Sequence, residues 1–276
     1  MFDSAFADSR GAKLKKLILL AAPLCLASSA YAQVAFAGSY SQNFDSLPST
    51  GTNIWSNNTT LLGWYAGTDV TAGMTSLIAG SGTSTTAGFY TFGLAGTNPV
   101  TERALGFVTS NAFTGASGSG RNSIGLFLQN TSGTALTNIQ VSYRGEQWRQ
   151  NGNTTAQSLT FGYAVNATQT DAGVLAASTT AIAGLTFTSP ITGSSATSLE
   201  GNLPANYSDL SATLTGLTLN AGETLLLRWI DVNDSGTDHT LAIDNVVVTG
   251  DAVPEPATIT ILAGAAALAA LRRRKK

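Results

Sequence analysis

Residues 124–143, IGLFLQNTSGTALTNIQVSY, contain two apolar segments separated by a short polar stretch. The first segment, 124–129, is a compact apolar run of strand length. The stretch that follows, Asn130-Thr131-Ser132-Gly133, consists of residues that favour turns. From 136 to 143 apolar and polar residues alternate, with Leu, Ile, Val and Tyr on the apolar side. This pattern predicts two consecutive β-strands joined by a turn.

Segments of the same kind recur along the middle of the chain, which is rich in Gly, Ser, Thr and Asn and lacks helical periodicity. Glycine-rich stretches at 80–88 and 115–120 are expected to be loops, because no strand-to-helix context or G-x-x-x-x-G-K makes them phosphate cradles. Many short strands at this spacing predict an all-β fold, a single jelly-roll-like β-sandwich over 33–250. Further strands are expected at 159–165, 212–219, 224–232 and 241–249.

The N-terminus has the three parts of a secretory signal. Three lysines between 13 and 16 precede an apolar run at 17–27, and small residues then lead to Ala30-Tyr31-Ala32. The run has about 11 residues, whereas a bilayer-spanning helix needs roughly 20. We therefore predict a signal peptide over residues 1–32 with a short apolar helix. Export machinery would recognise it, and signal peptidase would cut after Ala32, with Ala30 as the second small residue of the site.

The C-terminus ends in a polar break, an apolar segment and a basic end. The break is Val253-Pro254-Glu255-Pro256, whose prolines stop a helix from extending back into the domain. The apolar segment, 257–271, is short for a permanent anchor, since about 15 residues rise only roughly 22 Å as a helix. Positive charge beside such a helix is retained in the cytoplasm and acts as a stop-transfer signal. The basic residues are Arg272, Arg273, Arg274, Lys275 and Lys276.

This order of features over 251–276 resembles the PEP-CTERM sorting signal of Gram-negative bacteria. The resemblance implies transient retention in the inner membrane and processing by an exosortase-like protease near the Pro-Glu-Pro motif. It also implies association with exopolysaccharide or with the cell surface and outer membrane. A plain single-span transmembrane anchor is the alternative, and the two differ in whether the mature protein keeps its tail.

Charge is distributed unevenly along the chain. All five lysines lie in the two ends, and residues 33–252 carry 13 acidic residues against five arginines, a net charge of −8. Sparse arginines on an acidic domain exclude a nucleic-acid partner, because phosphate neutralisation needs clustered basic residues. The single cysteine, Cys25, falls in the predicted signal peptide, so we expect no disulfide in the exported domain.

Two segments, 141–149 and 227–239, hold most of the charged and large aromatic residues of the domain. Together with Asn43-Phe44-Asp45 and Ile243-Asp244-Asn245-Val246, this layout resembles jelly-roll sandwiches of the carbohydrate-binding-module type. The resemblance implies that the first and last strands pair. It also implies a structural calcium held by an acidic residue from each end of the domain, here Asp45 and Asp244.

A second acidic stretch offers another set of possible calcium ligands. Calcium takes six to eight oxygen ligands, and the spacing Asp-x-Asn-x-Ser-Gly imitates the first half of an EF-hand loop. The twelfth position is Ala242 instead of the required Glu, so an EF-hand is excluded. A solvated turn and a different kind of calcium loop both remain open. The residues concerned are Asp231, Asn233, Asp234 and Asp238.

A sugar-binding face is one interpretation of the aromatic and basic residues of these segments. Arg144, Trp148, Arg149 and Trp229 offer planar groups for hydroxyls and ring faces for the apolar side of a sugar. The alternative is core packing by the tryptophans and structural ion pairs by the arginines.

Catalytic signatures are weak. The chain has one histidine, His239, and no G-x-S-x-G nucleophile elbow. Asp238 is adjacent to it, so as strand residues the two would face opposite sides of the sheet. We therefore expect a non-catalytic exported surface or exopolysaccharide-associated protein. The alternatives are an extracellular carbohydrate-binding module and, less favoured, a secreted hydrolase.

Overall fold

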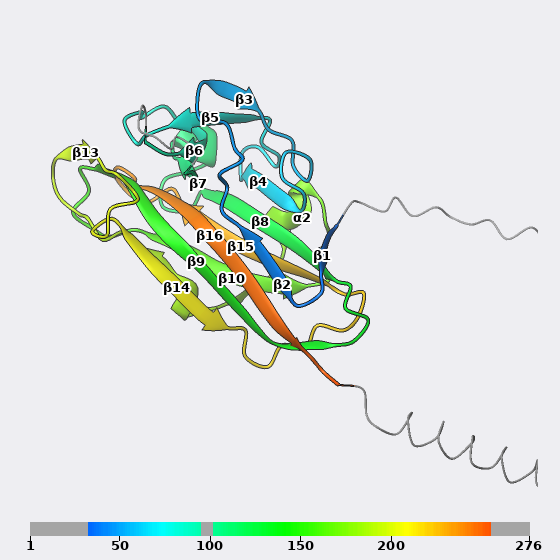
Figure 1. Cartoon of the computed structure of the whole chain (residues 1–276). Helices are drawn as coiled ribbons and strands as arrows, with labels where there is room; N and C mark the ends of the chain where they lie inside the picture. The colour runs from blue at the N-terminus through cyan, green and yellow to red at the C-terminus, as the bar shows by residue number, and fades with distance from the viewer. Residues whose placement is uncertain (1–32, 95–101, 255–276) are drawn as a thin grey trace, which may run out of the picture. The chain divides into compact units, whose positions relative to one another are not determined.

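The computed structural model describes residues 33–94 and 102–254, and these form two β-sheets (Figure 1). The all-β sandwich prediction is thereby confirmed. The predicted signal peptide and the tail from residue 255 onward lie outside the described residues. Among the described residues, three short helical segments connect strands: α1 (Asn111–Thr114), α2 (Asp171–Ala176) and the 3-10 turn η1 (Ala183–Leu185).

The first sheet has seven strands, and its central pair is formed by β8 and β15, which run antiparallel. β10 pairs with the free side of β15, and β11 and β12 follow on β10. On the other side of β8 lie β4, antiparallel, and β1, parallel. The strands are β1 (Val34–Phe36), β4 (Trp64–Thr68), β8 (Arg121–Asn130), β10 (Ser158–Val165), β11 (Thr180–Ala181), β12 (Phe187–Thr188) and β15 (Thr224–Val232).

The second sheet has nine strands and is built on the long antiparallel pair β9 and β16. β13 and β14 pair with β9, while β2 and β7 pair with β16. The first and last strands were expected to pair, but the last strand, β16, pairs with the second strand, β2, while β1 pairs with β8 in the other sheet. The strands are β2 (Ser39–Gln42), β3 (Thr52–Ile54), β5 (Ser76–Gly80), β6 (Gly88–Phe92), β7 (Ala104–Val108), β9 (Leu136–Asn151), β13 (Ala196–Ser198), β14 (Tyr207–Thr213) and β16 (Thr240–Ala252).

The strand predictions hold well except at one place. The strand expected at 212–219 is wrong in its extent: β14 begins at Tyr207 and ends at Thr213. The chain turns immediately afterwards, where Leu217 N donates to Leu214 O at 3.2 Å and Gly216 adopts a φ of 77°. Leu214 and Leu219 still enter the core, but from a turn and not from a continuous strand.

The main core lies between the two sheets and is centred on Trp229 of β15. Its ring stacks on Trp64 at 5.9 Å and meets Tyr143 and Phe161 edge-on at 5.6 and 5.3 Å. Aromatic pairs of this geometry add to the stabilisation from burial itself.

A smaller core covers the other face of the nine-stranded sheet. Trp148 of β9 stacks on Phe92, which in turn stacks on Tyr90, with centroid distances of 5.7 and 5.2 Å. The loop around Gly201 lies directly on the Trp148 indole, so close that a Cβ at position 201 would meet it at 2.5 Å. A third layer of loops therefore closes this face.

Candidate functional site

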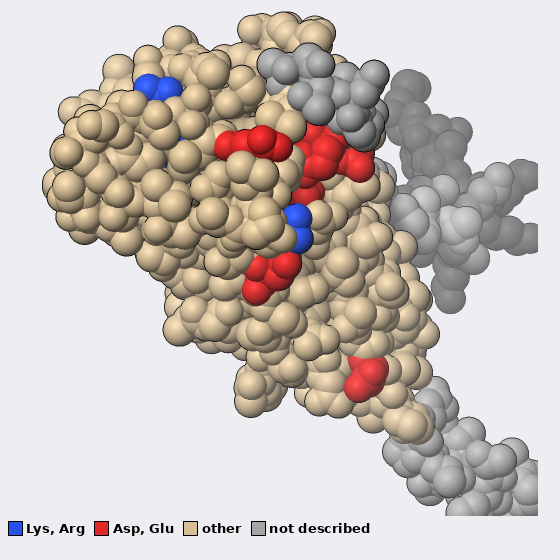
Figure 2. All heavy atoms as spheres, turned by 60° about the vertical axis from the view of Figure 1, so that its left-hand side comes forward, with Lys and Arg blue, Asp and Glu red and all other residues tan. Residues whose placement is uncertain are grey.

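Three acidic side chains converge on the outer face of the nine-stranded sheet, beside Trp148. Glu102, Glu146 and Asp244 each place one carboxylate oxygen within 4.8 Å of the others. Glu146 and Asp244 are 0% and 1% exposed, and Glu102 is half-buried. Figure 2 shows a face of the domain on which acidic side chains gather and basic atoms are sparse.

The register of β9 and β16 brings two of these residues together. Glu146 lies opposite Ala242, and Asp244 lies opposite Arg144. Paired residues and residues two apart on one strand share a face, so Glu146 and Asp244 are diagonal neighbours. Directly after Asp244 the register shifts by one residue, and Asn245 takes a left-handed φ of 50°. This β-bulge bends the strand at the site.

Each carboxylate is held through one of its oxygens. Trp148 Nε1 donates to Glu146 Oε2 at 2.9 Å, and Asn245 Nδ2 donates to Asp244 Oδ2 at 2.6 Å. Asn202 Nδ2 donates to Glu102 Oε2. The second oxygens of the two buried groups, Glu146 Oε1 and Asp244 Oδ1, are buried without a hydrogen-bond partner in the described part of the chain.

Burial and mutual repulsion shift the acid-base behaviour of the group. Burial, followed by the charge of Glu102, raises the pKa of Glu146 to about 8. Burial, followed by the charge of Glu146, raises the pKa of Asp244 to about 9. Burial also raises the pKa of Glu102 above its usual range. Without a cation, Glu146 and Asp244 therefore tend to stay protonated at neutral pH.

The donor set suits a hard cation. All candidate ligand atoms are carboxylate oxygens, which calcium prefers, and the orphaned oxygens of Glu146 and Asp244 would gain a partner. Asp45, the other predicted ligand, is close enough for its charge to act on Glu102 and Asp244. Its own oxygens are engaged, since Oδ1 accepts from Arg103 N at 3.2 Å and Oδ2 from Asn43 Nδ2 at 2.7 Å.

The sequence interpretation missed two of the three converging residues. Glu102 and Glu146 were not among the predicted metal ligands. The signal for Glu146 is its spacing of two from Trp148 on an extended strand, which places both side chains on one face. No local pattern marks Glu102, which precedes β7 and reaches the site only through the sheet.

The second predicted metal set does not form a site within residues 33–94 and 102–254. Asp231 accepts from Asn122 Nδ2 at 3.3 Å, and Asn233 Nδ2 donates to Asn111 Oδ1 at 2.8 Å. Asp238 Oδ1 accepts from Asp234 N at 2.6 Å, a hydrogen bond within the loop. Asp231 belongs to strand β15, and both Asp231 and Asn233 are buried, so neither lies in a solvated turn.

The predicted sugar-binding face is not formed. Trp148 and Trp229 are both 0% exposed and belong to separate cores on the two faces of the nine-stranded sheet, so neither offers a ring to a ligand.

The two arginines of that predicted face have structural contacts instead. Arg144 pairs with Asp209 across β9 and β14 at 2.8 Å and lies over the Tyr207 ring. Arg149 donates to Asn151 Oδ1 at 2.5 Å and to the Gly82 carbonyl at 3.2 Å. Arg144 therefore forms a structural ion pair, as in the alternative interpretation, whereas Arg149 makes hydrogen bonds to neutral groups.

His239 is a buried structural residue. Its Nε2 lies 3.2 Å from the Asn153 carbonyl, which can only accept, so Nε2 carries the proton. The Ser189 hydroxyl then donates to Nδ1 at 2.8 Å. Both side chains are almost inaccessible, at 1% and 3% exposure, and burial lowers the pKa of His239. The pair connects three loops and has no room for a substrate.

The sorting residues begin where the last strand ends. β16 stops at Ala252, and Val253 N still donates to the Ala135 carbonyl at 2.9 Å. Val253 and Pro254 are exposed, while Glu255, Pro256 and the basic end lie outside the described residues. A model of the PEP-CTERM protein-sorting motif matches residues 252–275. The chain carries a PEP-CTERM sorting motif. The motif marks an exported, cell-surface-associated protein that exosortase-type machinery recognises.

Apart from its PEP-CTERM motif, this chain resembles known proteins only distantly. No curated protein is significantly similar in sequence. Among solved structures, an exo-β-1,3-galactanase from Phanerochaete chrysosporium is 13% identical, with a TM-score of 0.26, over 77% of this chain and 29% of its own. The K3 adhesin domain of Lys-gingipain from Porphyromonas gingivalis is 14% identical, with a TM-score of 0.32, over 57% of this chain and 79% of the adhesin domain. Carbohydrate-binding modules of the β-sandwich superfamily give 14% identity, a TM-score of 0.28, and coverage of 71% and 62%.

The first three similar structures are much longer than this chain, which spans only about a fifth to a third of their length. Within the part of the PEP-CTERM chain that the structure describes, no helix is long and apolar enough to cross a membrane. The predicted apolar helix at 257–271 lies beyond that part.

Proposed function

We propose that the protein is a non-catalytic surface component of a Gram-negative envelope, retained in or on exopolysaccharide. It would pass the inner membrane, lose its signal peptide, and be held briefly by its tail before an exosortase-like protease releases it. The observation that carries this proposal is the PEP-CTERM motif, which starts at Ala252, the last residue of β16. Its exposed first residues give a protease direct access.

The buried acidic group supports a structural role over a catalytic one. Glycosidic cleavage needs two carboxyl groups that flank a substrate in an open site. Glu146 and Asp244 are closed off by the sheet and by the loop around Gly201 and Asn202. We propose that Glu102, Glu146 and Asp244 hold a structural calcium, with Asp45 adding negative charge nearby. The ion would tie β9 and β16 to the chain before β7.

The experiment is mass spectrometry of the protein from its native envelope, compared with a variant carrying Pro254→Ala and Glu255→Ala. We expect the native protein to begin at Gln33 and to lack the apolar and basic parts of the tail. The variant should keep its tail and remain in the inner membrane. An intact tail on the native protein at the cell surface would overturn the proposal. Polysaccharide hydrolysis that Glu146→Gln abolishes would overturn its non-catalytic part.

A further inference from the structure

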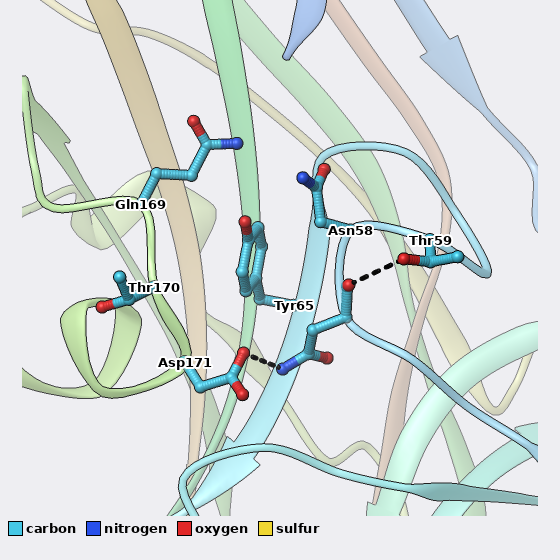
Figure 3. Close-up of a pocket in the computed structure, with 7 residues that line it drawn as sticks. Asn58, Thr59, Tyr65, Gln169, Thr170 and Asp171 are labelled. Atoms are coloured by element: carbon cyan, nitrogen blue, oxygen red, sulfur yellow. Dashed lines mark hydrogen bonds between the residues drawn. The ribbon is translucent and has the colours of Figure 1, made fainter. Parts of the chain in front are cut away.

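A polar pocket of about 360 Å³ lies on the seven-stranded side of the sandwich, away from the acidic group. It is formed by the loop that precedes β4, by β4 itself and by the start of α2 (Figure 3). Its volume is in the range of small-molecule sites, roughly 300 to 1,000 Å³. The lining residues are Asn57, Asn58, Thr59, Tyr65, Gln169, Thr170 and Asp171.

Gln169 presents an unused hydrogen-bond donor to this pocket. Its Oε1 accepts from Gln33 Nε2 at 3.0 Å, which fixes the orientation of the amide. The opposite atom, Nε2, is buried and has no partner among the described residues. The residue is only 9% exposed, and Figure 3 shows its amide nitrogen turned toward Asn58 across the space above Tyr65. A buried donor without an acceptor is costly unless a ligand or water meets it.

Asn58 is held in the same way from the opposite wall. Its Oδ1 accepts from Gly63 N at 2.8 Å, so Nδ2 is the half of the amide that is left for a ligand. The left-handed φ of 58° at Asn58 is a conformation that Asn tolerates better than most residues. Two amide donors are thus fixed on facing walls before any ligand arrives.

Asp171 supplies an acceptor at the rim of the pocket. Asn57 Nδ2 donates to its Oδ1 at 2.8 Å, and Asn57 is itself fixed, because Trp55 Nε1 and Ala66 N donate to it at 2.6 and 2.8 Å. The other carboxylate oxygen lies against Gly73, where a Cβ would approach it to 2.3 Å. The carboxylate therefore keeps one position.

The chemistry of this lining selects the ligand class. Sugar hydroxyls both donate and accept, so they match two fixed amide donors and a fixed carboxylate acceptor. An anion is disfavoured, because the lining contains one carboxylate and no basic residue and the domain carries a net charge of −8. We infer that this pocket binds a residue of a neutral saccharide. The inference rests on the proposed non-catalytic surface role and makes it specific by naming a ligand class.

The test uses the full-length protein, saturated with calcium, and free glucose, galactose and mannose as probes, with glucuronate as the anionic comparison. Binding is detected by saturation-transfer NMR and quantified by calorimetry. Asn58→Asp and Gln169→Glu each replace a donor nitrogen by oxygen and keep the shape and the anchored acceptor. Gln129→Glu adds the same charge outside the pocket, where Gln129 Nε2 donates to the Gly222 carbonyl in an exposed position.

We expect at least one neutral sugar to bind, and both pocket variants to weaken that binding by about fivefold to a hundredfold. The Gln129→Glu protein should bind like wild type, and glucuronate should bind more weakly than glucose. The inference is overturned if no neutral sugar binds, if either pocket variant binds like wild type, or if glucuronate is preferred. Tail processing and the effect of calcium on melting are measured separately, so their failure is distinguishable from a failure of this site.

Discussion

Calcium should stabilise this protein, and Glu146→Gln should remove that effect. The buried carboxylates bind the ion only when they are ionised, and the unfolded chain has no such group of oxygens. Calcium at one hundred times its dissociation constant adds about 2.7 kcal/mol to the free energy of unfolding. For a domain of this size that raises the melting temperature by roughly 5 to 10 °C.

The same variant should behave differently in chelator. The rise in the pKa of Glu146 from 4.5 to about 8 corresponds to on the order of 5 kcal/mol lost when the group ionises in the folded state. Gln has no charge to desolvate, and its amide oxygen still accepts from Trp148 Nε1. In EDTA at pH 8.5, Glu146→Gln should therefore be more stable than wild type, although it no longer responds to calcium.

Differential scanning calorimetry with EDTA and with excess calcium measures both effects. Glu223→Gln is the matched control, because Glu223 lies in an exposed turn where it accepts from Asn220. It should keep the full calcium shift. An unchanged melting temperature of the wild type on addition of calcium would refute the metal assignment. A calcium shift that survives Glu146→Gln would place the ion elsewhere.

Three further predictions concern stability. In EDTA, the free energy of unfolding from urea titrations should fall as pH rises from about 4.5 to 9. The raised pKa values of Glu146 and Asp244 mean that the folded state binds more protons than the unfolded state over this range. A flat or rising profile would contradict this. Trp229→Ala should cost about 3 to 5 kcal/mol in the same titrations, since it removes the centre of the aromatic core. Arg144→Ala should cost about 1 kcal/mol or less, because the Asp209 side chain is 65% exposed and solvent screens its pair with Arg144. A cost above 2 kcal/mol would show that the pair is structurally essential.

The alternation of apolar and polar residues predicted strand segments that have one face in water. It did not predict segments that are covered on both faces. The first half of β9 alternates between buried and exposed positions, so its strand was visible in the sequence. From Gly145 to Trp148 every residue is buried, because the loop around Gly201 covers the outer face. Whether Trp148 binds a ligand or packs under a loop depends on that third layer, which no local pattern of β9 reveals.

The polar pocket was invisible for a related reason. Asn58 and Gln169 are more than a hundred residues apart in the sequence, and each lies in a stretch of ordinary turn composition. What makes them a candidate site is that one half of each amide is anchored by another segment, Gly63 in one case and Gln33 in the other. Such anchoring is a property of the folded contacts.

The acidic group depends on a single inserted residue in β16. The apolar residues that enter the main core from this strand are Leu241, Ile243, Val246 and Val248, a spacing of two, then three, then two. An unbroken strand would turn one of these pairs toward the outer face, because side chains alternate with a period of two. The bulge at Asn245 absorbs the extra residue and lets both pairs face inward. Asp244 is then the last residue before the bulge reverses which face the alternate side chains occupy. Its carboxylate lies outside the main core, beside Glu146. The spacing of three is visible in the sequence, although we predicted no bulge from it. It did not indicate which residue of β9 would lie opposite, and that register is what joins Asp244 to Glu146.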